Sequence, residues 1–314
     1  MGSCTSKSQI SSQPQTSDKP PMKAVTSSNG SASRTRVLAE REYHNVESST
    51  YVLPKDDQEK DRLHGQHYVL KEKFGGNLLK PELTAKLFEK DINVLDVGCG
   101  PATWLMDMAT EYPDSNFYGV DIADTFPQAI HPRNLKFQVA NVLEPLPFDF
   151  KFDFIQVRLL TVALRESEWE IAFRNVYNAL KPGGIFQVIE GCPLLNTTDP
   201  EMIVIRTNMA QLVRKKQQNP DMSSQLEIVM EQENFKVLYK QAIELPMGHG
   251  TPADIAAGDS YKEVLLGMAP FMAPQMNVDI EEYKKLVLKA AANMGPTKTT
   301  ISLWGYLGQR PKDN

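Results

Sequence analysis

The sequence predicts an α/β fold with a doubly wound, mostly parallel sheet of seven strands. Five short runs rich in apolar and β-branched residues alternate with helical patterns between positions 92 and 190, and two more strand-like runs follow at 235–243 and 299–307. A glycine-rich turn, Gly98-Cys99-Gly100, comes directly after the first run, where a strand would meet a helix. Such alternation is typical of a parallel sheet covered by helices on both faces.

The composition agrees with a globular chain that has a well-buried core. Its 314 residues are 41% hydrophobic, and no apolar run approaches the ~20 residues that span a bilayer. The cysteines, Cys4, Cys99 and Cys192, have neither disulfide-framework nor metal-ligand spacing, so we expect a reducing, cytoplasmic setting and no metal site. The net charge is −5, and because residues 1–36 carry +4, the remainder carries −9. An acidic body argues against nucleic-acid binding.

Residues 1–40 are predicted to be a disordered tail. The first 36 include ten serines and almost no large apolar side chains, so they bury too little surface to offset the entropy of ordering. The tail begins MGSCTSK, in which Gly2 followed by Ser6 matches the N-myristoylation pattern and Cys4 is available for palmitoylation. Two acyl chains hold a protein at a membrane, so the motif predicts a peripheral lipoprotein. The alternative is an ordinary polar N-terminus.

Residues 41–76 are predicted to form an N-terminal helical lid. Acidic residues open the stretch DDQEKDRLHGQHYVLKEKF, and Leu63, His67 and Leu70 then recur at one-turn spacing until a Gly-Gly pair ends the helix. His64 and His67 stand three residues apart, but no acidic or cysteine partner completes a metal site.

A single domain is predicted over residues 77–314. Its strands are expected, in chain order, at 92–97, 116–121, 135–140, 152–157, 185–190, 235–243 and 299–307. Helices are expected between the early strands at 101–112 and 166–180, and between the last two strands at 252–271 and 279–293. The last two helices form an insertion at about 250–296, which we expect to be a wall of a substrate pocket.

The turn after the first strand is the expected ligand site, because open α/β sheets bind ligands beyond the carboxyl ends of their central strands. A dinucleotide site needs G-x-G-x-x-G, but the third glycine position is Thr103. S-adenosylmethionine has no phosphate, and Asp96 suits its ammonium group better than a pyrophosphate. Asp121 can accept hydrogen bonds from the ribose of either cofactor, whereas Asn141 and Val142 are placed to meet an adenine edge.

As a set, these motifs resemble those of class I S-adenosylmethionine-dependent methyltransferases. LDVGCG, the acid in GVDI, ANVLEPLPF, FDFIQVR and LKPGG follow that family's order and spacing over roughly residues 43–310. The segment SSTYVLPKDDQEKDRLHGQHYVLKEKFGGNL more narrowly resembles fungal LaeA-like methyltransferases, which are related to secondary-metabolism regulators.

The resemblance implies a Rossmann-like fold and S-adenosyl-L-methionine as the cofactor, with the nucleus as an alternative location. Carried over by motif, the cofactor-binding residues are Asp96, Gly98, Cys99, Gly100, Asp121, Ile122, Asn141, Val142 and Arg158. Ala102 replaces a glycine that many members have, and its side chain is small enough to be tolerated.

The acceptor side of the site is less determined by sequence. Methyl transfer from a sulfonium needs an acceptor held in line with the S–CH3 bond in a dry pocket, and a catalytic residue is optional. Candidates for a charge clamp or a base are Arg158, Glu190 and His249, whose alternative roles are an ion pair, a loop cap and a mobile loop histidine. Three residues of the N-terminal segment are expected to cover the cofactor: Tyr51, Gln66 and His67.

The function predicted first is an enzyme that transfers a methyl group from S-adenosylmethionine to a small-molecule or protein acceptor. A second hypothesis is a cofactor-binding regulatory module that acts through protein partners with little turnover. A third is a nicotinamide-dependent oxidoreductase. The acceptor stays open, because a pocket is assembled from distant loops and a fold does not name a substrate.

Overall fold

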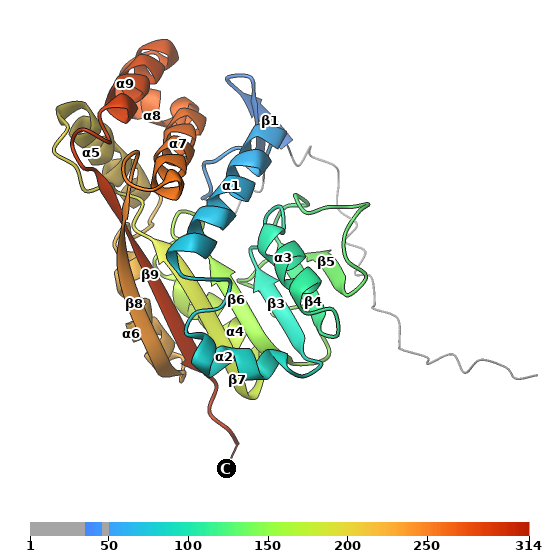
Figure 1. Cartoon of the computed structure of the whole chain (residues 1–314). Coiled ribbons are helices and arrows are strands. Elements are labelled where there is room, and N and C mark those ends of the chain that lie inside the picture. The colour runs from blue at the N-terminus through green and yellow to red at the C-terminus, as the bar shows by residue number, and fades with distance from the viewer. Residues whose placement is uncertain (1–34, 46–49, 314) are drawn as a thin grey trace, which may run out of the picture. The chain divides into compact units, whose positions relative to one another are not determined.

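The computed structural model describes residues 35–45 and 50–313 (Figure 1). The predicted acylation sites, Gly2 and Cys4, lie outside the described residues, as does most of the predicted tail. The prediction of disorder is wrong for residues 35–40, because β1 (Thr35–Leu38) pairs antiparallel with β2 (Arg41–His44). Tyr43 anchors this hairpin: its ring is buried and its hydroxyl donates to the carbonyl of Gly267 at 2.7 Å.

The central sheet has seven strands in the order β5-β4-β3-β6-β7-β9-β8. Their bounds are β3 Asn93–Val97, β4 Asn116–Asp121, β5 Leu135–Val139, β6 Phe152–Arg158, β7 Leu180–Gly191, β8 Lys236–Pro246 and β9 Thr300–Gln309. The first five of these strands run parallel, while β9 is antiparallel to both of its neighbours. The predicted mostly parallel, seven-stranded sheet is confirmed.

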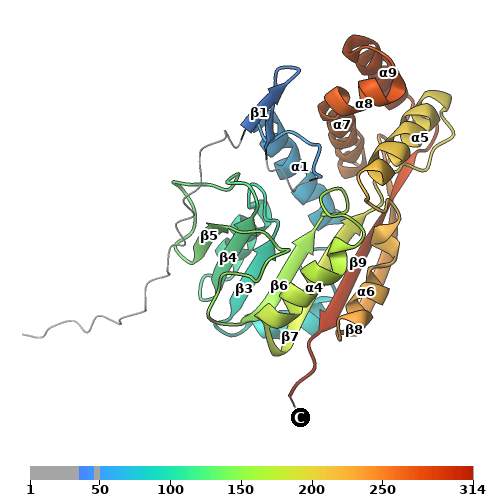
Figure 2. The ribbon, with the colours of Figure 1, turned by 180° about the vertical axis from the view of Figure 1, so that it is seen from behind.

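Helices cover both faces of the sheet (Figures 1 and 2). On one face, α2 (Pro81–Phe88) and α3 (Thr103–Glu111) bury Phe88 and Trp104 against the strands. On the other face, α4 (Glu168–Ala179) and α6 (Leu226–Gln232) bury apolar side chains in a second cluster. Because the side chains on both faces of the sheet are buried, the sequences of the central strands are nearly continuous apolar runs.

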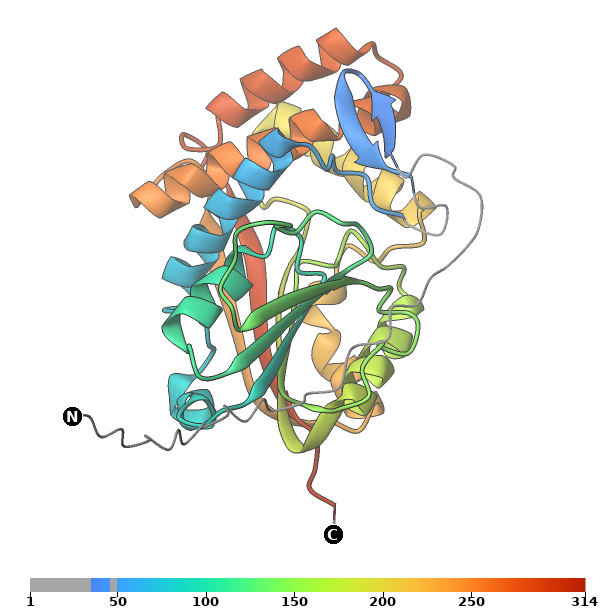
Figure 3. The ribbon, with the colours of Figure 1, turned by 90° about the vertical axis from the view of Figure 1, so that its right-hand side faces the viewer.

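The lid and the helical insertion lie beyond the carboxyl edge of the sheet. Figure 3 shows α1 (Asp57–Lys73) beside α7 (Pro252–Gly267), and these two helices pack against each other. The other helices there are α5 (Pro200–Lys215), α8 (Ala269–Met276) and α9 (Ile280–Ala292), with the short η1 (Met222–Ser224) after α5.

The helix predicted at 252–271 is in fact two helices, α7 and α8. Pro270 stands in the first turn of α8 and has no backbone N–H, so it cannot continue the hydrogen-bond ladder of α7. At the start of α7 the Thr251 hydroxyl accepts from the Asp254 N–H, and the Asp254 carboxylate accepts from the Thr251 N–H. None of the helices in the described part of the chain is long and apolar enough to cross a bilayer.

Candidate active site

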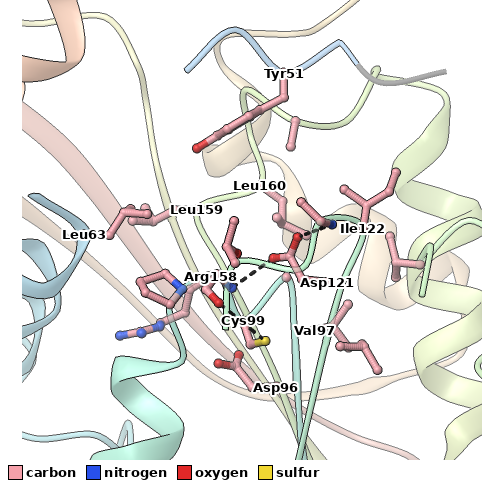
Figure 4. A pocket seen from close by; sticks show the side chains of 18 of the residues that line it. Tyr51, Leu63, Asp96, Val97, Cys99, Asp121, Ile122, Arg158, Leu159 and Leu160 are labelled. Carbon is pink, nitrogen blue, oxygen red and sulfur yellow. Dashed lines mark hydrogen bonds between the residues drawn. The ribbon is translucent and has the colours of Figure 1, made fainter. Parts of the chain in front are cut away.

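A cavity of about 220 Å³ opens at the carboxyl ends of β3, β4 and β6. The parallel register pairs Val97 of β3 with Val157 of β6, so the residues that end these strands meet at one edge. The predicted cofactor-binding residues all line this cavity: Asp96, Gly98, Cys99, Gly100, Asp121, Ile122, Asn141, Val142 and Arg158. Several of these side chains, with Tyr51, Leu63, Leu159 and Leu160, are seen in Figure 4. The role of each toward a ligand stays a prediction.

The glycine turn brings backbone close to the cavity. Gly98 has a φ of +72°, and a Cβ there would lie 2.8 Å from the Cδ2 atom of Leu160, so only glycine fits without a shift. Ala102 also has a positive φ, 62°, just before α3 begins. The next residue, Thr103, is buried in the cavity wall, and its hydroxyl has no hydrogen-bond partner among the described residues. Sequence reasoning treated Thr103 only as a missing glycine, whereas here it offers a polar group to a ligand.

Asp121 connects the turn to the end of β4. Its two carboxylate oxygens accept from the backbone N–H of Gly100 and of Ala123, each at 2.9 Å (Figure 4). Burial raises the pKa of Asp121, and these backbone donors lower it. A carboxylate has about four lone-pair sites on its two oxygens, so Asp121 retains acceptor capacity for a ribose diol.

Asp96 and Arg158 both line the cavity and interact electrostatically. Burial raises the pKa of Asp96 to about 7, opposed by the positive charge of Arg158. Burial likewise lowers the pKa of Arg158, and Asp96 raises it. A bound ammonium group would favour ionised Asp96, and a bound carboxylate would satisfy the guanidinium.

A hydrogen-bonded chain connects Arg158 to the lid. Arg158 Nη1 donates to His67 Nδ1 at 3.3 Å, which leaves Nε2 as the protonated nitrogen that donates to Asp107 at 3.3 Å. Asp107 also accepts from Lys71 at 2.6 Å and from Asn77 at 2.7 Å. Burial and the charge of Arg158 lower the pKa of His67 to about 4, so its ring is neutral at pH 7.

The sequence did not reveal this network. His67 and Asp107 stand forty positions apart and belong to no shared motif, so only the packing of α1 on α3 brings them together. The other histidine of the pair, His64, is exposed, and its Nδ1 is hydrogen-bonded to the carbonyl of Lys60. The two histidines of α1 therefore have separate partners.

A second cavity, of about 150 Å³, adjoins the first one. The two cavities share wall residues from the lid and from the loop after β6: Tyr51, Leu63, Gln66, Leu70 and Leu159. Two of the three N-terminal residues expected to cover the cofactor, Tyr51 and Gln66, thus line both cavities, while His67 lines the first.

The structure separates the three catalytic candidates. Arg158 lines the first cavity and not the second, so its position favours the cofactor over an acceptor carboxylate. Glu190 lines the second cavity, and its carboxylate accepts from Leu160 N, Thr161 N and Thr161 Oγ1 at 2.7, 3.1 and 2.7 Å. His249 lines neither cavity, and its Nδ1 contacts the carbonyl of Met247.

The donor set of the first cavity fits S-adenosylmethionine. Asp121 has two oxygens that can accept from the ribose hydroxyls. Asp96 offers a carboxylate to the ammonium group of the cofactor, and Arg158 offers a guanidinium to its carboxylate. The hydroxyl of Thr103, at the start of α3, has no partner among the described residues. Asn141 Oδ1 accepts from Leu143 N at 3.1 Å, which fixes the loop expected to hold adenine.

Comparison with known proteins agrees with this chemistry. Residues 94–184 match the family model of a methyltransferase domain. The N-methyltransferase verN of Clonostachys rogersoniana is 24% identical over 275 residues, which cover 84% of this chain and 93% of verN. The N-methyltransferase gliN of Aspergillus fumigatus is 26% identical and is matched over 69% of this chain and 78% of its own length.

A regulator is also among the relatives. The secondary metabolism regulator laeA of Aspergillus fumigatus is 32% identical over 161 residues, which cover 48% of this chain but only 39% of laeA. Among solved structures, a putative sarcosine dimethylglycine methyltransferase from Galdieria sulphuraria covers 83% of this chain and 93% of its own, with 13% identity and a TM-score of 0.47.

The fold and the site agree with the family match: residues 94–184 match a methyltransferase domain, the sheet is that of class I S-adenosylmethionine-dependent methyltransferases, and S-adenosylmethionine is the cofactor. Within this class it resembles the fungal LaeA-like proteins and the verN and gliN N-methyltransferases. Thr103 stands where the dinucleotide-binding motif would have its third glycine, which agrees with S-adenosylmethionine rather than a nicotinamide dinucleotide as the cofactor.

Proposed function

We propose that the chain is an active enzyme that methylates a small-molecule or protein acceptor. The observation that supports this proposal is the second cavity, which shares a wall with the cofactor cavity, so that an acceptor bound there would lie beside the donor. A module that only bound the cofactor would not need such a space. The relatives verN and gliN, named N-methyltransferases, support turnover as well.

The chain's own residues would position the donor and exclude water. When bound, S-adenosylmethionine would supply an electrophilic methyl group to a lone pair of the acceptor, and its sulfur would keep the electron pair of the broken carbon–sulfur bond as a neutral thioether. Asp121 would hold the ribose, and Asp96 and Arg158 would hold the two charged ends of the methionine moiety. Leu63, Leu70 and Leu159 at the shared wall would keep water from the reacting atoms.

The test is transfer of a labelled methyl group. The full chain is incubated with methyl-tritiated S-adenosylmethionine and an extract of the native host, and labelled products are separated. The proposal predicts a labelled product that is absent when the chain is omitted. If repeated assays give no labelled product while S-adenosylhomocysteine still binds the chain, catalytic turnover is contradicted.

The second candidate function is a regulatory module that acts through protein partners. It is favoured by the match to the secondary metabolism regulator laeA. The test is recovery of specific partners with the tagged full chain from the native host, compared with an Asp121→Ala variant. Partners that depend on cofactor binding, together with no labelled product, would favour this role.

Acylation of Gly2 and Cys4, and with it peripheral membrane association from the cytoplasm, also stays a proposal. Its support is the MGSCTSK motif. A nuclear location is the alternative that the LaeA-like resemblance suggests. Mass spectrometry of the intact N-terminus from the native host tests the proposal, and an unmodified or merely acetylated Gly2 would contradict it.

A further inference from the structure

The second cavity is walled mainly by apolar side chains. It lies between the lid helix α1, the insertion helix α7 and the ends of β7 and β9. Its volume is about 150 Å³, against about 220 Å³ for the cofactor cavity. The lining has two ionisable residues with a formal charge at pH 7, Arg62 and Glu190.

Both of these charges are already satisfied within the protein. Arg62 is 8% exposed and makes a bidentate pair with Glu59, through Nε at 2.8 Å and Nη2 at 2.6 Å. Its third nitrogen, Nη1, donates to Ser260 Oγ at 3.2 Å. Glu190 is fully buried and accepts the three hydrogen bonds from Leu160 and Thr161 described above. Neither residue has an unpaired charge to offer a ligand.

Most neutral polar groups of the cavity are engaged as well. The Tyr261 hydroxyl donates to the carbonyl of Pro193 at 2.6 Å, and the Cys192 thiol donates to the carbonyl of Leu194 at 3.7 Å. Gln66 is different: within the described residues its amide makes no hydrogen bond to protein, and it lines both cavities. One free amide therefore stands at the junction, where the methyl group would pass.

We propose that the second cavity is the acceptor site and that it selects an uncharged, mainly apolar small molecule whose single polar end meets the amide of Gln66. A charged acceptor would have to leave water without a counter-ion, which costs several kcal/mol. An apolar one gains burial against the leucine, valine and methionine side chains of the wall. The inference rests on the proposed function and narrows its acceptor to one class.

A matched pair of fluorophores tests the selectivity. N-phenyl-1-naphthylamine is neutral, and 8-anilino-1-naphthalenesulfonate has the same ring system with one added sulfonate. Both are titrated into the full chain saturated with S-adenosylhomocysteine, so that the first cavity is filled. We expect the neutral compound to bind at least about tenfold more tightly than the sulfonate. Equal binding, or tighter binding of the sulfonate, would overturn the proposal.

Substitutions at two adjacent alanines of α7 test whether the neutral compound binds in the second cavity. Ala257 is 6% exposed and lines the second cavity, whereas Ala256 is exposed and does not. We expect Ala257→Leu, which fills part of the cavity, to weaken the neutral compound about tenfold, and Ala256→Leu to leave it unchanged. Val264→Phe narrows the same cavity from two turns further along α7 and should act like Ala257→Leu. Unchanged affinity in both filled variants would contradict the assignment.

The two proposals fail in different ways. The fluorophore readout requires no methyl transfer, so it judges the cavity even for an inactive chain. S-adenosylhomocysteine binding by Ala257→Leu shows that the variant is folded and that the first cavity is intact. Loss of labelled product with intact fluorophore selectivity would contradict turnover alone. Labelled product with no selectivity would contradict only the acceptor class.

Discussion

At the scale of single residues, Asp121 has two tasks in the cavity. It accepts from Gly100 and Ala123, which holds the glycine turn in place, and it is expected to accept from the ribose. The carboxylate suits both, because it accepts on two oxygens and donates nothing. An amide at this position would turn an NH2 group toward one of the backbone donors.

We therefore expect Asp121→Asn to weaken binding of S-adenosylmethionine by at least about tenfold, with a loss of about 1–3 kcal/mol of stability from the unpaired buried N–H. Isothermal titration calorimetry measures the affinity. The control is Asp124→Asn, since Asp124 is exposed, lies on the same loop and does not line the cavity. Equal affinities in the two variants would show that Asp121 does not hold the cofactor.

His67 is the second residue with a testable role. Its ring accepts from Arg158 and donates to Asp107, which requires the neutral form. The pKa of His67 in the fold, about 4, is below its ordinary value of 6.5. As the pH falls between these two values, the unfolded chain binds a proton that the folded chain does not, so the contribution of His67 to stability is lost with falling pH.

His67→Gln provides the measurement, because glutamine keeps one acceptor and one donor and does not titrate. Urea unfolding at pH 7 and pH 4.5 should show that the wild-type chain loses about 2 kcal/mol more than the variant on acidification. Asp96 and Glu190, whose pKa values are raised to about 7, titrate in both proteins and cancel in the comparison. A parallel decline of the two proteins would contradict a neutral, buried His67.

At the scale of elements, α1 does more than cover the cavities. Its buried Glu59 lines the cofactor cavity and its buried Arg62 lines the second cavity, so one ion pair joins their walls. The N-terminus of the helix is fixed by Asp56, which accepts from the Glu59 N–H and pairs with Arg41 of the hairpin. The hairpin, the lid and both cavities are therefore coupled through α1.

Removing one partner of the buried pair leaves an uncompensated charge. We expect Arg62→Met to lower the free energy of unfolding by about 3–5 kcal/mol, because Glu59 then stays buried alone. The matched control on the same helix is Lys60→Met, whose exposed pair with Asp57 should cost no more than about 1 kcal/mol. Denaturant unfolding measures the free energy of unfolding of both variants. A similar decrease in the two variants would mean that the Arg62–Glu59 pair is not buried in solution.

At the scale of the whole molecule, sequence patterns predicted the sheet and the donor side of the site. Those features are local: apolar runs mark the strands, and the turn from Asp96 to Gly100 needs specific residues within a few positions. The second cavity was beyond such reasoning, because its wall combines residues as distant as Leu63 and Leu303. The hairpin at 35–44 was missed because Tyr43 finds its partner, Gly267, only after folding.

The most direct test of the central claim is isothermal titration calorimetry of the full chain with S-adenosylmethionine, S-adenosylhomocysteine and NAD. The account predicts that the first two ligands bind one per chain and that NAD does not bind. At a free concentration of 100 times its dissociation constant, each of the first two should stabilise the fold by about 2.7 kcal/mol. Binding of NAD without binding of either S-adenosyl ligand would contradict the account.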